Sequence, residues 1–422
     1  MACVGRSVAA QGFESAPAGA IFGVAKGGTR DRLDVTAALS EAYDREPPPD
    51  LRPRIQNGAL PGGFSSMMTA AAEYERSRRR ADVTGQVFTA LQYYPSLGEV
   101  VVLTHNAGVG AKVALPARSS LELTQTVAYS PTDLYRLFPT MEVPGVGGAL
   151  PSSPDYRVDE FRSLSYVTRV SVASGSSRGN QIRAAAERTA TDFEGDADRR
   201  DLETFTGAMA FAHGVGRTGT LSLEYQYREG EYGYGRTAEH KVGISANYSP
   251  ALSRTRRVQL RLTLSPSAID VPDLTAGIEA AGTLYRMEAE GSAEYPFSRT
   301  WTIRGAYRRG LEYIPVLRQP VFQDAVRVET AGLVRERVDV SASAGKVAGE
   351  SILQRENQLL DTYTGTIRAR YSLNRSVAIY GQYLYYYYDL RGQAGLAPDL
   401  PPRFEQHGLR LGLMLWARPV SR

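Results

Sequence analysis

The sequence predicts an all-β protein, a transmembrane antiparallel up-and-down β-barrel of about 18 strands. Three observations carry this prediction. Apolar and polar residues alternate along most of the chain, the breaks between alternating runs are short and long in turn, and aromatic residues lie at two heights on the apolar face. Together they describe strands that cross both interfaces of a membrane.

The alternation has a period of two residues. The segment 220–228 places Leu and Tyr on one face and Ser, Glu, Gln and Arg on the other, and 258–264 and 285–295 repeat the pattern. Successive side chains of a strand point to opposite faces, whereas a helix would spread these charges around its axis. The expected strands, with ends good to about three residues, are 32–44, 65–77, 81–94, 100–113, 119–129, 160–173, 179–192, 201–214, 218–229, 237–249, 257–266, 283–294, 299–310, 324–335, 337–348, 361–373, 375–389 and 406–418.

The breaks between these runs differ in length. Breaks after even-numbered runs are short, and breaks after odd-numbered runs are longer, although 95–99 is shorter than the others of its class. Short turns at one end and long loops at the other are typical of membrane barrels. The short breaks lie around 78–80, 116–118, 215–217, 295–298 and 373–374, and the long ones are 45–64, 130–159, 267–282, 311–323, 349–360 and 390–405.

Aromatic residues on the apolar face fall next to one kind of break or the other. Strand propensity alone explains why tyrosine is common, but it does not explain two heights. We therefore expect two belts of rings, one at each membrane–water interface. The short-turn belt comprises Tyr248, Tyr295, Trp301 and Tyr371, and the long-loop belt comprises Tyr93, Tyr129, Tyr227, Tyr285, Tyr363 and Tyr385.

Composition excludes several classes of protein. The chain has 422 residues, of which 42% are hydrophobic, and no window approaches the roughly 18 apolar residues of a membrane helix. Its one cysteine, Cys3, rules out a disulfide framework and a cysteine-based metal site. The net charge is +4 and the basic residues are spread along the chain, so nothing indicates a nucleic-acid partner.

The chain divides into three parts: an N-terminal segment 1–31, the barrel 32–418 and a C-terminal extension 419–422. The N-terminal segment lacks the apolar region of an export signal, but the small residues 7–10 resemble the end of a cleavage site. We expect this segment to hold the remnant of a signal peptide and a periplasmic tail.

Residues 32–418 resemble the porin-like outer-membrane β-barrel proteins of Gram-negative bacteria, and more narrowly poorly characterised barrels of which some are associated with exopolysaccharide systems. Val87–Leu97, Ala378–Leu390 and Gln406–Trp416 carry the resemblance. The last of these resembles the C-terminal signal strand of such proteins, although here the chain continues to Arg422. The resemblance implies location in the bacterial outer membrane, contact with its lipid and insertion by the barrel assembly machinery. It carries over no catalytic residue.

Charged residues on the polar face are the candidate functional residues, because alternation directs them into the lumen. They could form cross-strand ion pairs that stiffen the wall, or a charged lining that weakly favours anions. The expected lumen residues are Arg169, Arg228, Arg261, Arg286, Arg304, Arg308, Arg327, Arg368, Arg370 and Arg410, with Glu122, Glu224, Glu288, Glu290, Glu294, Glu329 and Asp339.

No motif indicates catalysis, a cofactor or a metal. Residues 214–219 match G-x-G-x-x-G, but they join two alternating runs, where glycine serves a tight turn. The four histidines lie on separate runs without metal-ligand spacing. We expect a channel for small hydrophilic solutes. The alternatives are a non-conducting structural or assembly component, linked to surface-polysaccharide export, and thirdly a hydrolase with its site in the barrel wall.

Overall fold

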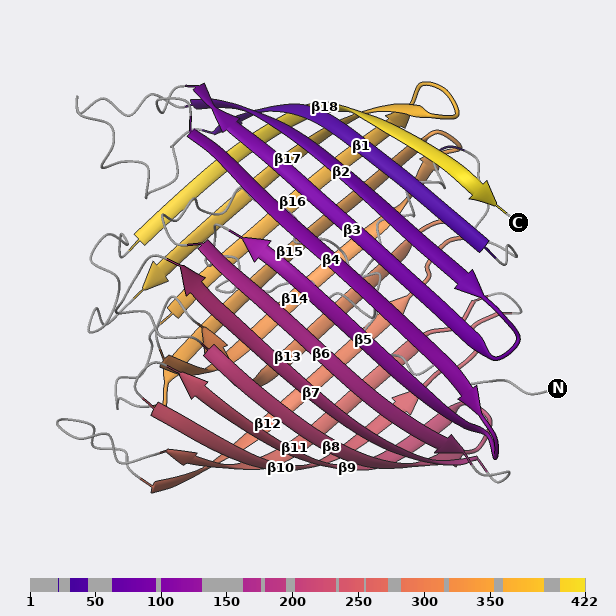
Figure 1. Ribbon diagram of the computed structural model, residues 1–422, viewed down its shortest axis with the longest axis vertical. Helices are drawn as coiled ribbons and strands as arrows, with labels where there is room; N and C mark the ends of the chain where they lie inside the picture. The colour runs from indigo at the N-terminus through magenta and orange to yellow at the C-terminus, as the bar shows by residue number, and fades with distance from the viewer. Residues whose placement is uncertain are drawn as a thin grey trace.

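In the computed structural model a single closed sheet accounts for nearly all residues that the structure describes (Figure 1). The described residues are 22, 31–44, 63–95, 100–130, 162–175, 179–194, 202–232, 235–253, 256–271, 282–314, 319–352, 360–390 and 403–421. Within this part of the chain, no helix is long and apolar enough to cross a membrane.

The sheet has 18 strands, and each strand pairs antiparallel with its neighbours in the chain. The last strand pairs with the first, which closes the sheet into an up-and-down barrel and confirms the predicted fold. The strands are β1 Asp31–Asp44, β2 Gly63–Ser77, β3 Ala81–Tyr94, β4 Val100–Leu115, β5 Ser119–Ser130, β6 Arg162–Gly175, β7 Asn180–Glu194, β8 Leu202–Val215, β9 Gly219–Tyr232, β10 Gly235–Tyr248, β11 Gln259–Val271, β12 Gly282–Tyr295, β13 Thr302–Ile314, β14 Gln319–Arg335, β15 Val338–Ser351, β16 Leu360–Ser372, β17 Val377–Leu390 and β18 Arg403–Ser421.

Most strand ends lie within three residues of the expected ones, and the larger differences cluster in one region. β11 continues past Pro266 to Val271, β13 continues to Ile314, and β14 begins at Gln319. The expected long loop 311–323 is therefore wrong, because most of it is strand. At the C-terminus, β18 continues to Ser421 in register with β1.

The two ends of the barrel differ. Tight turns such as 116–118 and 336–337 lie at one end, called here the short-turn end, together with the start of β1 and the end of β18 (Figure 1). The connection between β10 and β11 is longer than the others of this end and contains a bridge between Ala251 and Arg257. The opposite end is called the long-loop end.

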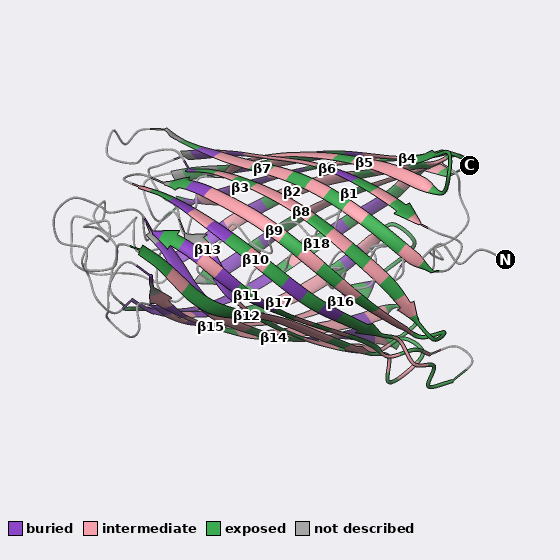
Figure 2. Cartoon of the chain, turned by 90° about the horizontal axis from the view of Figure 1, so that it is seen from below, coloured by how far each residue is buried: buried purple, intermediate pink, exposed green. Residues whose placement is uncertain are grey.

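The two faces of the wall differ as sharply. Leu221, Leu223, Leu260, Leu262 and Leu264 project outwards, each 42–54% exposed. Residues of the other face contact each other across strands that are not neighbours, as Lys241 of β10 does with Glu288 of β12, so this face is the concave inner one. Buried residues are most frequent along the long-loop half of the strands (Figure 2). A barrel in water has a polar outer face and an apolar interior. Here the polarity is reversed, which suits a wall surrounded by lipid.

One seam of the wall is incomplete. β12 pairs with β11 along its whole length, from Glu294↔Gln259 to Gly282↔Val271. Its pairing with β13 ends at Ala289↔Arg309, and among the described residues no ladder pair joins the rest of β12 to β13. The β13–β14 ladder nevertheless continues to Ile314↔Gln319. The tip of this hairpin, residues 310–314 and 319–323 (the hairpin tip), has therefore left the wall as one unit.

Candidate functional site

The polar interior is the candidate site, and its tightest charge network joins β9, β10 and β12. The guanidinium of Arg228 lies 2.8 Å from the carboxylate of Glu239, whose side chain is 1% exposed. Lys241 Nζ lies 2.8 Å from Glu288 Oε2, and this ion pair joins β10 to β12. Buried charges of this kind are stable only when paired, and here every charge has a partner of opposite sign.

Arginine dominates the inner face on the other side of the barrel, over β16 to β18. Arg370 binds Asp339 through two hydrogen bonds, Nε to Oδ1 at 2.8 Å and Nη2 to Oδ2 at 2.5 Å, a bidentate geometry that only arginine offers. Arg368 and Arg410 both lie opposite the uncharged Gln382 in the ladders. This side of the interior therefore carries more positive than negative charge.

Between these regions, acids and bases alternate across neighbouring strands. Arg304 lies between Glu294 of β12 and Glu329 of β14, and Glu290 lies opposite Arg308. Opposite charges placed directly across a ladder stabilise the pairing of strands by up to about 1 kcal/mol. These rungs cross the paired part of the β12–β13 seam.

Part of the interior is accessible to water. Arg169 and Glu187 form a cross-strand pair at 3.7 Å with side chains that are 42% and 38% exposed. Arg308, which pairs with Glu312 at 3.1 Å, is 44% exposed. Charged side chains that stay this exposed on an inner face indicate a hydrated space beside them.

All residues expected in the lumen lie on the inner face by strand alternation. Arg327 pairs with Glu329 on its own strand, and Arg286 approaches Glu350 at 3.9 Å. Arg261 and Glu224 lie within electrostatic reach of Arg183. The expected inner residues in the described strands are thus Arg169, Arg228, Arg261, Arg286, Arg304, Arg308, Arg327, Arg368, Arg370, Arg410, Glu122, Glu224, Glu288, Glu290, Glu294, Glu329 and Asp339.

The sequence prediction omits several inner charges, among them Arg183, Glu187, Glu239 and Lys241. Alternation could have found them. In β10, Val242 and Ile244 are exposed on the outer face, which assigns Glu239 and Lys241 to the inner one. In β7, exposed Ile182 assigns Arg183 and Glu187 inwards in the same way. Two of these four are acids and two are bases, so together they add no net charge to the interior.

The hairpin tip lies inside the barrel. By alternation with exposed Val326 and Val328, Phe322 and its ladder partner Leu311 belong to the outer face of their strands. Yet Leu311 is 1% and Phe322 2% exposed. Both pack in an apolar cluster with residues of the inner face of β8 and β11, Leu202, Ile269 and Val271, and with Ile352 and Leu284. The outer face of the tip therefore rests against the inner face of the wall.

Side chains from the wall replace the backbone partners that the tip has lost. The N–H of Leu311 donates to Glu288 Oε1 at 3.2 Å, and its carbonyl accepts a hydrogen bond from Arg228 Nη2 at 2.8 Å. Unsatisfied backbone groups in an apolar environment are costly. The charge network of β9, β10 and β12 thus also holds the hairpin tip.

At the short-turn end, Phe22 lies within the barrel. Its ring stacks on the inward ring of Trp416, with centroids 5.3 Å apart and planes 10° apart. Ala378 and Met414 complete this cluster, and Leu333 and Tyr380 pack beside it. The interior therefore has an apolar cluster near each end and charged surface between them.

The expected belt residues lie on the outer face near the two ends. At the short-turn end, Trp301 donates its indole N–H to the carbonyl of Leu333 at 3.1 Å, and its ring lies 2.4 Å from where a Cβ on Gly332 would be, so only glycine fits there. Near the long-loop end, rings pair with outward histidines, as Tyr129 does with His105. The belt positions are Tyr248, Tyr295, Trp301 and Tyr371 at one end, and Tyr93, Tyr129, Tyr227, Tyr285, Tyr363 and Tyr385 towards the other.

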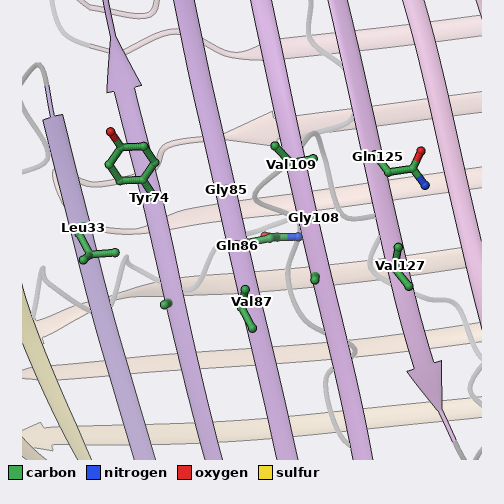
Figure 3. Close-up of a pocket in the computed structure, with 11 residues that line it drawn as sticks. Leu33, Tyr74, Gly85, Gln86, Val87, Gly108, Val109, Gln125 and Val127 are labelled. Atoms are coloured by element: carbon green, nitrogen blue, oxygen red, sulfur yellow. The ribbon is translucent and has the colours of Figure 1, made fainter.

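The outer wall also carries an open groove across β1 to β5 (Figure 3). Small residues such as Ala72, Gly85 and Ala107 form its floor, and exposed Val87 and Val109 stand along it. Because it lies on the apolar outer face, it is separate from the charged interior. It is suited to lipid chains rather than to a hydrophilic solute.

The described residues contain no group of three or more side chains suited to hold a metal ion. The histidines are far apart and bond locally: His213 to Asn180, His105 to Thr89, His240 to Tyr225 and His407 to Tyr383, each at 2.6–2.9 Å. These bonds place all four on the outer face. The glycines at 214–219 belong to the β8–β9 turn, where Gly216 has a φ of +66°.

No protein-family model and no curated protein matches the sequence. Solved structures similar to this chain include OccAB2 of Acinetobacter baumannii, with a TM-score of 0.48 and 9% identity over 93% of this chain and 100% of that one. They also include the outer membrane protein OpdK of Pseudomonas aeruginosa (TM-score 0.43, 10% identity, 91% and 99% covered). OccK2 of the same organism, solved with glucuronate, has a TM-score of 0.45 at 9% identity, with 92% and 100% covered.

Proposed function

We propose that the protein is a porin-like channel for small hydrophilic solutes in the outer membrane of a Gram-negative bacterium. The supporting observation is the polarity of the wall: leucines and valines on the outer face and hydrated ion pairs such as Arg169–Glu187 on the inner face. A ring of about 18 strands is wide enough to enclose an aqueous path. Lipid surrounds the barrel in this proposal, and the barrel assembly machinery inserts it.

The selectivity we propose is a weak preference for anions. The β16–β18 side offers Arg368, Arg370 and Arg410 against Asp339, and guanidinium groups replace the hydration of a carboxylate or phosphate well. The opposite side carries Glu239 and Glu288, each held by a base. Since most charges neutralise each other across neighbouring strands, the surplus acting on a passing ion is small.

Single-channel recording of the refolded protein in a planar bilayer tests this proposal. We expect discrete conductance steps and, in a salt gradient, a reversal potential displaced slightly towards that of the anion. A silent bilayer would refute the channel, and a strongly cation-selective pore would refute the proposed selectivity.

A second candidate function is supported by the two apolar clusters. Phe22 on Trp416 and Leu311 with Phe322 fill parts of the interior near opposite ends. A barrel permanently filled in this way would serve as a structural or assembly component, linked to surface-polysaccharide export. It would give no conductance steps even after the hairpin tip or Phe22 is altered.

A further inference from the structure

We propose that the β13–β14 hairpin tip is a movable part of the wall with two positions. In the first, seen here, it is tucked inside the long-loop end. In the second it returns to the wall and completes the β12–β13 seam. The consequence for conduction, that the return clears the long-loop end of the interior, rests on the proposed channel function.

The sequence of the tip fits the second position as well as the first. If the register of Ala289↔Arg309 continues, Leu311 comes opposite Met287 and Glu312 opposite Arg286. Met287 is 54% exposed on the outer face, so Leu311 and its partner Phe322 would join an apolar, lipid-facing surface. Arg286 and Glu312 would form a cross-strand ion pair on the inner face. Leu311, Phe322 and Glu312 thus fall on the correct sides of the wall.

The first position is stabilised by interactions that can be exchanged for those of the second. Glu288 and Arg228 hold the N–H and the carbonyl of Leu311, and those two groups lie where a ladder to Met287 would form. The cluster around Phe322 buries apolar surface that lipid would cover in the wall. In each position the N–H and carbonyl of Leu311 have hydrogen-bond partners, and the apolar side chains of the tip are covered.

In the described part of the barrel, the tucked position leaves part of the β12 edge without a neighbouring strand, which is unfavourable. The β12 segment from Gly282 to Glu288 has no ladder partner on its β13 side among the described residues. Tyr285, within this segment, is 81% exposed, the highest value among the large hydrophobic side chains of the described residues. An unpaired strand edge is unfavourable next to lipid, which favours return of the tip.

The hairpin tip leaves the wall at Gly310, directly after the end of the β12–β13 ladder. Gly310 is the first residue of β13 beyond the last pair with β12, and a Cβ placed on it would lie 3.1 Å from Glu288 Oε2. A glycine at this point lets the strand pass close over the Glu288 carboxylate in the tucked position. The rest of β13 stays paired on both sides, so the motion involves the tip alone.

Disulfide trapping tests the proposal in the full-length protein with its single cysteine replaced, Cys3→Ser. The pair Met287→Cys and Leu311→Cys should form a disulfide on oxidation only if the tip reaches the wall, where directly opposite residues have Cβ atoms about 4.5–5.5 Å apart. The control pair, Ala293→Cys and Gly305→Cys, lies opposite in the intact part of the same seam. A Cβ on Gly305 meets nothing within 4 Å.

We expect both pairs to cross-link on a gel, and we expect oxidation of the Met287–Leu311 pair to raise the unitary conductance until reductant is added. Cross-linking of the control pair alone would overturn the second position. Cross-linking of both pairs with unchanged conductance would overturn its role in conduction. If every form is silent while both pairs cross-link, the motion is supported and the channel function itself is refuted.

Discussion

The two edges of β12 differ in how far they are paired. Towards β11, every residue from Gly282 to Glu294 has a ladder partner. Towards β13, pairing ends at Ala289, and beyond it Glu288 and Arg228 bind the backbone of Leu311 in the displaced hairpin tip. The comparison teaches that charged side chains on the inner face can hold the backbone of a strand that has left its ladder.

The largest effect should come from the apolar cluster behind the incomplete edge. Replacing Leu311 with Ala should weaken the tucked position by about 2–5 kcal/mol, because the residue is buried and leaves a cavity. Leu262→Ala on the outer face of β11 is the matched control, since lipid fills the space there. Amide exchange at residues 310–312 measures the difference, and equal protection in both variants would contradict the tucked packing.

The edge of β12 that is paired with β11 is tested by placing a charge on the lipid-facing side of β11. Leu264 lies midway along β11 between the belt heights of Tyr248 and Tyr285 and pairs with Ala289. Leu264→Arg should destabilise the barrel by about 2–4 kcal/mol. Thr263→Arg, on the inner face, should be tolerated. Urea unfolding of both refolded variants in lipid vesicles measures this, and equal midpoints would mean that the two faces are misassigned.

A smaller effect is expected from the hydrogen bond between the Glu288 carboxylate and the Leu311 N–H. Glu288→Gln should weaken the bond to the Leu311 N–H by about 1 kcal/mol, since a neutral acceptor replaces a charged one. The Leu311 amide should then exchange about fivefold faster. Glu290→Gln, two residues along the same face, should leave that amide unaffected. Unchanged exchange in Glu288→Gln would show that the carboxylate does not hold the tip.

The smallest effect is expected on ion selectivity, when charged residues of the inner face are neutralised. Replacing Arg304 and Arg368 with Gln should move the reversal potential towards cations, and replacing Glu224 and Glu294 with Gln should move it towards anions. A unit charge about 10 Å from an ion in water contributes about 0.4 kcal/mol, which is about a twofold change in permeability ratio. Shifts in the same direction for both variants would exclude selectivity by these charges.

The sequence predicted the number of strands, their order and most of their ends, because alternation is a local property of each strand. It failed where non-local packing decides. The sequence pattern ends a strand at Pro266 and assigns Leu311 to a loop, but β11 stays paired past the proline and β14 pairs with Leu311. No local pattern indicates that Phe322 meets Ile269, since the contact depends on how the closed wall curves.

The candidate site divides in the same way. Alternation assigns Arg228 and Glu288 to the inner face, as strand periodicity requires. It does not reveal that both bind the backbone of Leu311. That role depends on a hairpin leaving its ladder, and a strand that leaves the wall has the same residue pattern as one that stays. The roles of the inner charges in conduction remain predictions.

The pairing of β18 with β1 has a consequence for how the chain is made. Arg418 holds Asp34 through hydrogen bonds of 2.6 and 3.1 Å, a contact between residues 384 positions apart. Contacts of such separation form slowly, because almost the whole chain must be ordered first. A chain interrupted before β18 would not give a smaller barrel but an open sheet with two exposed edges, prone to join other strands. The wall can therefore close only after the last strand of the chain has been made.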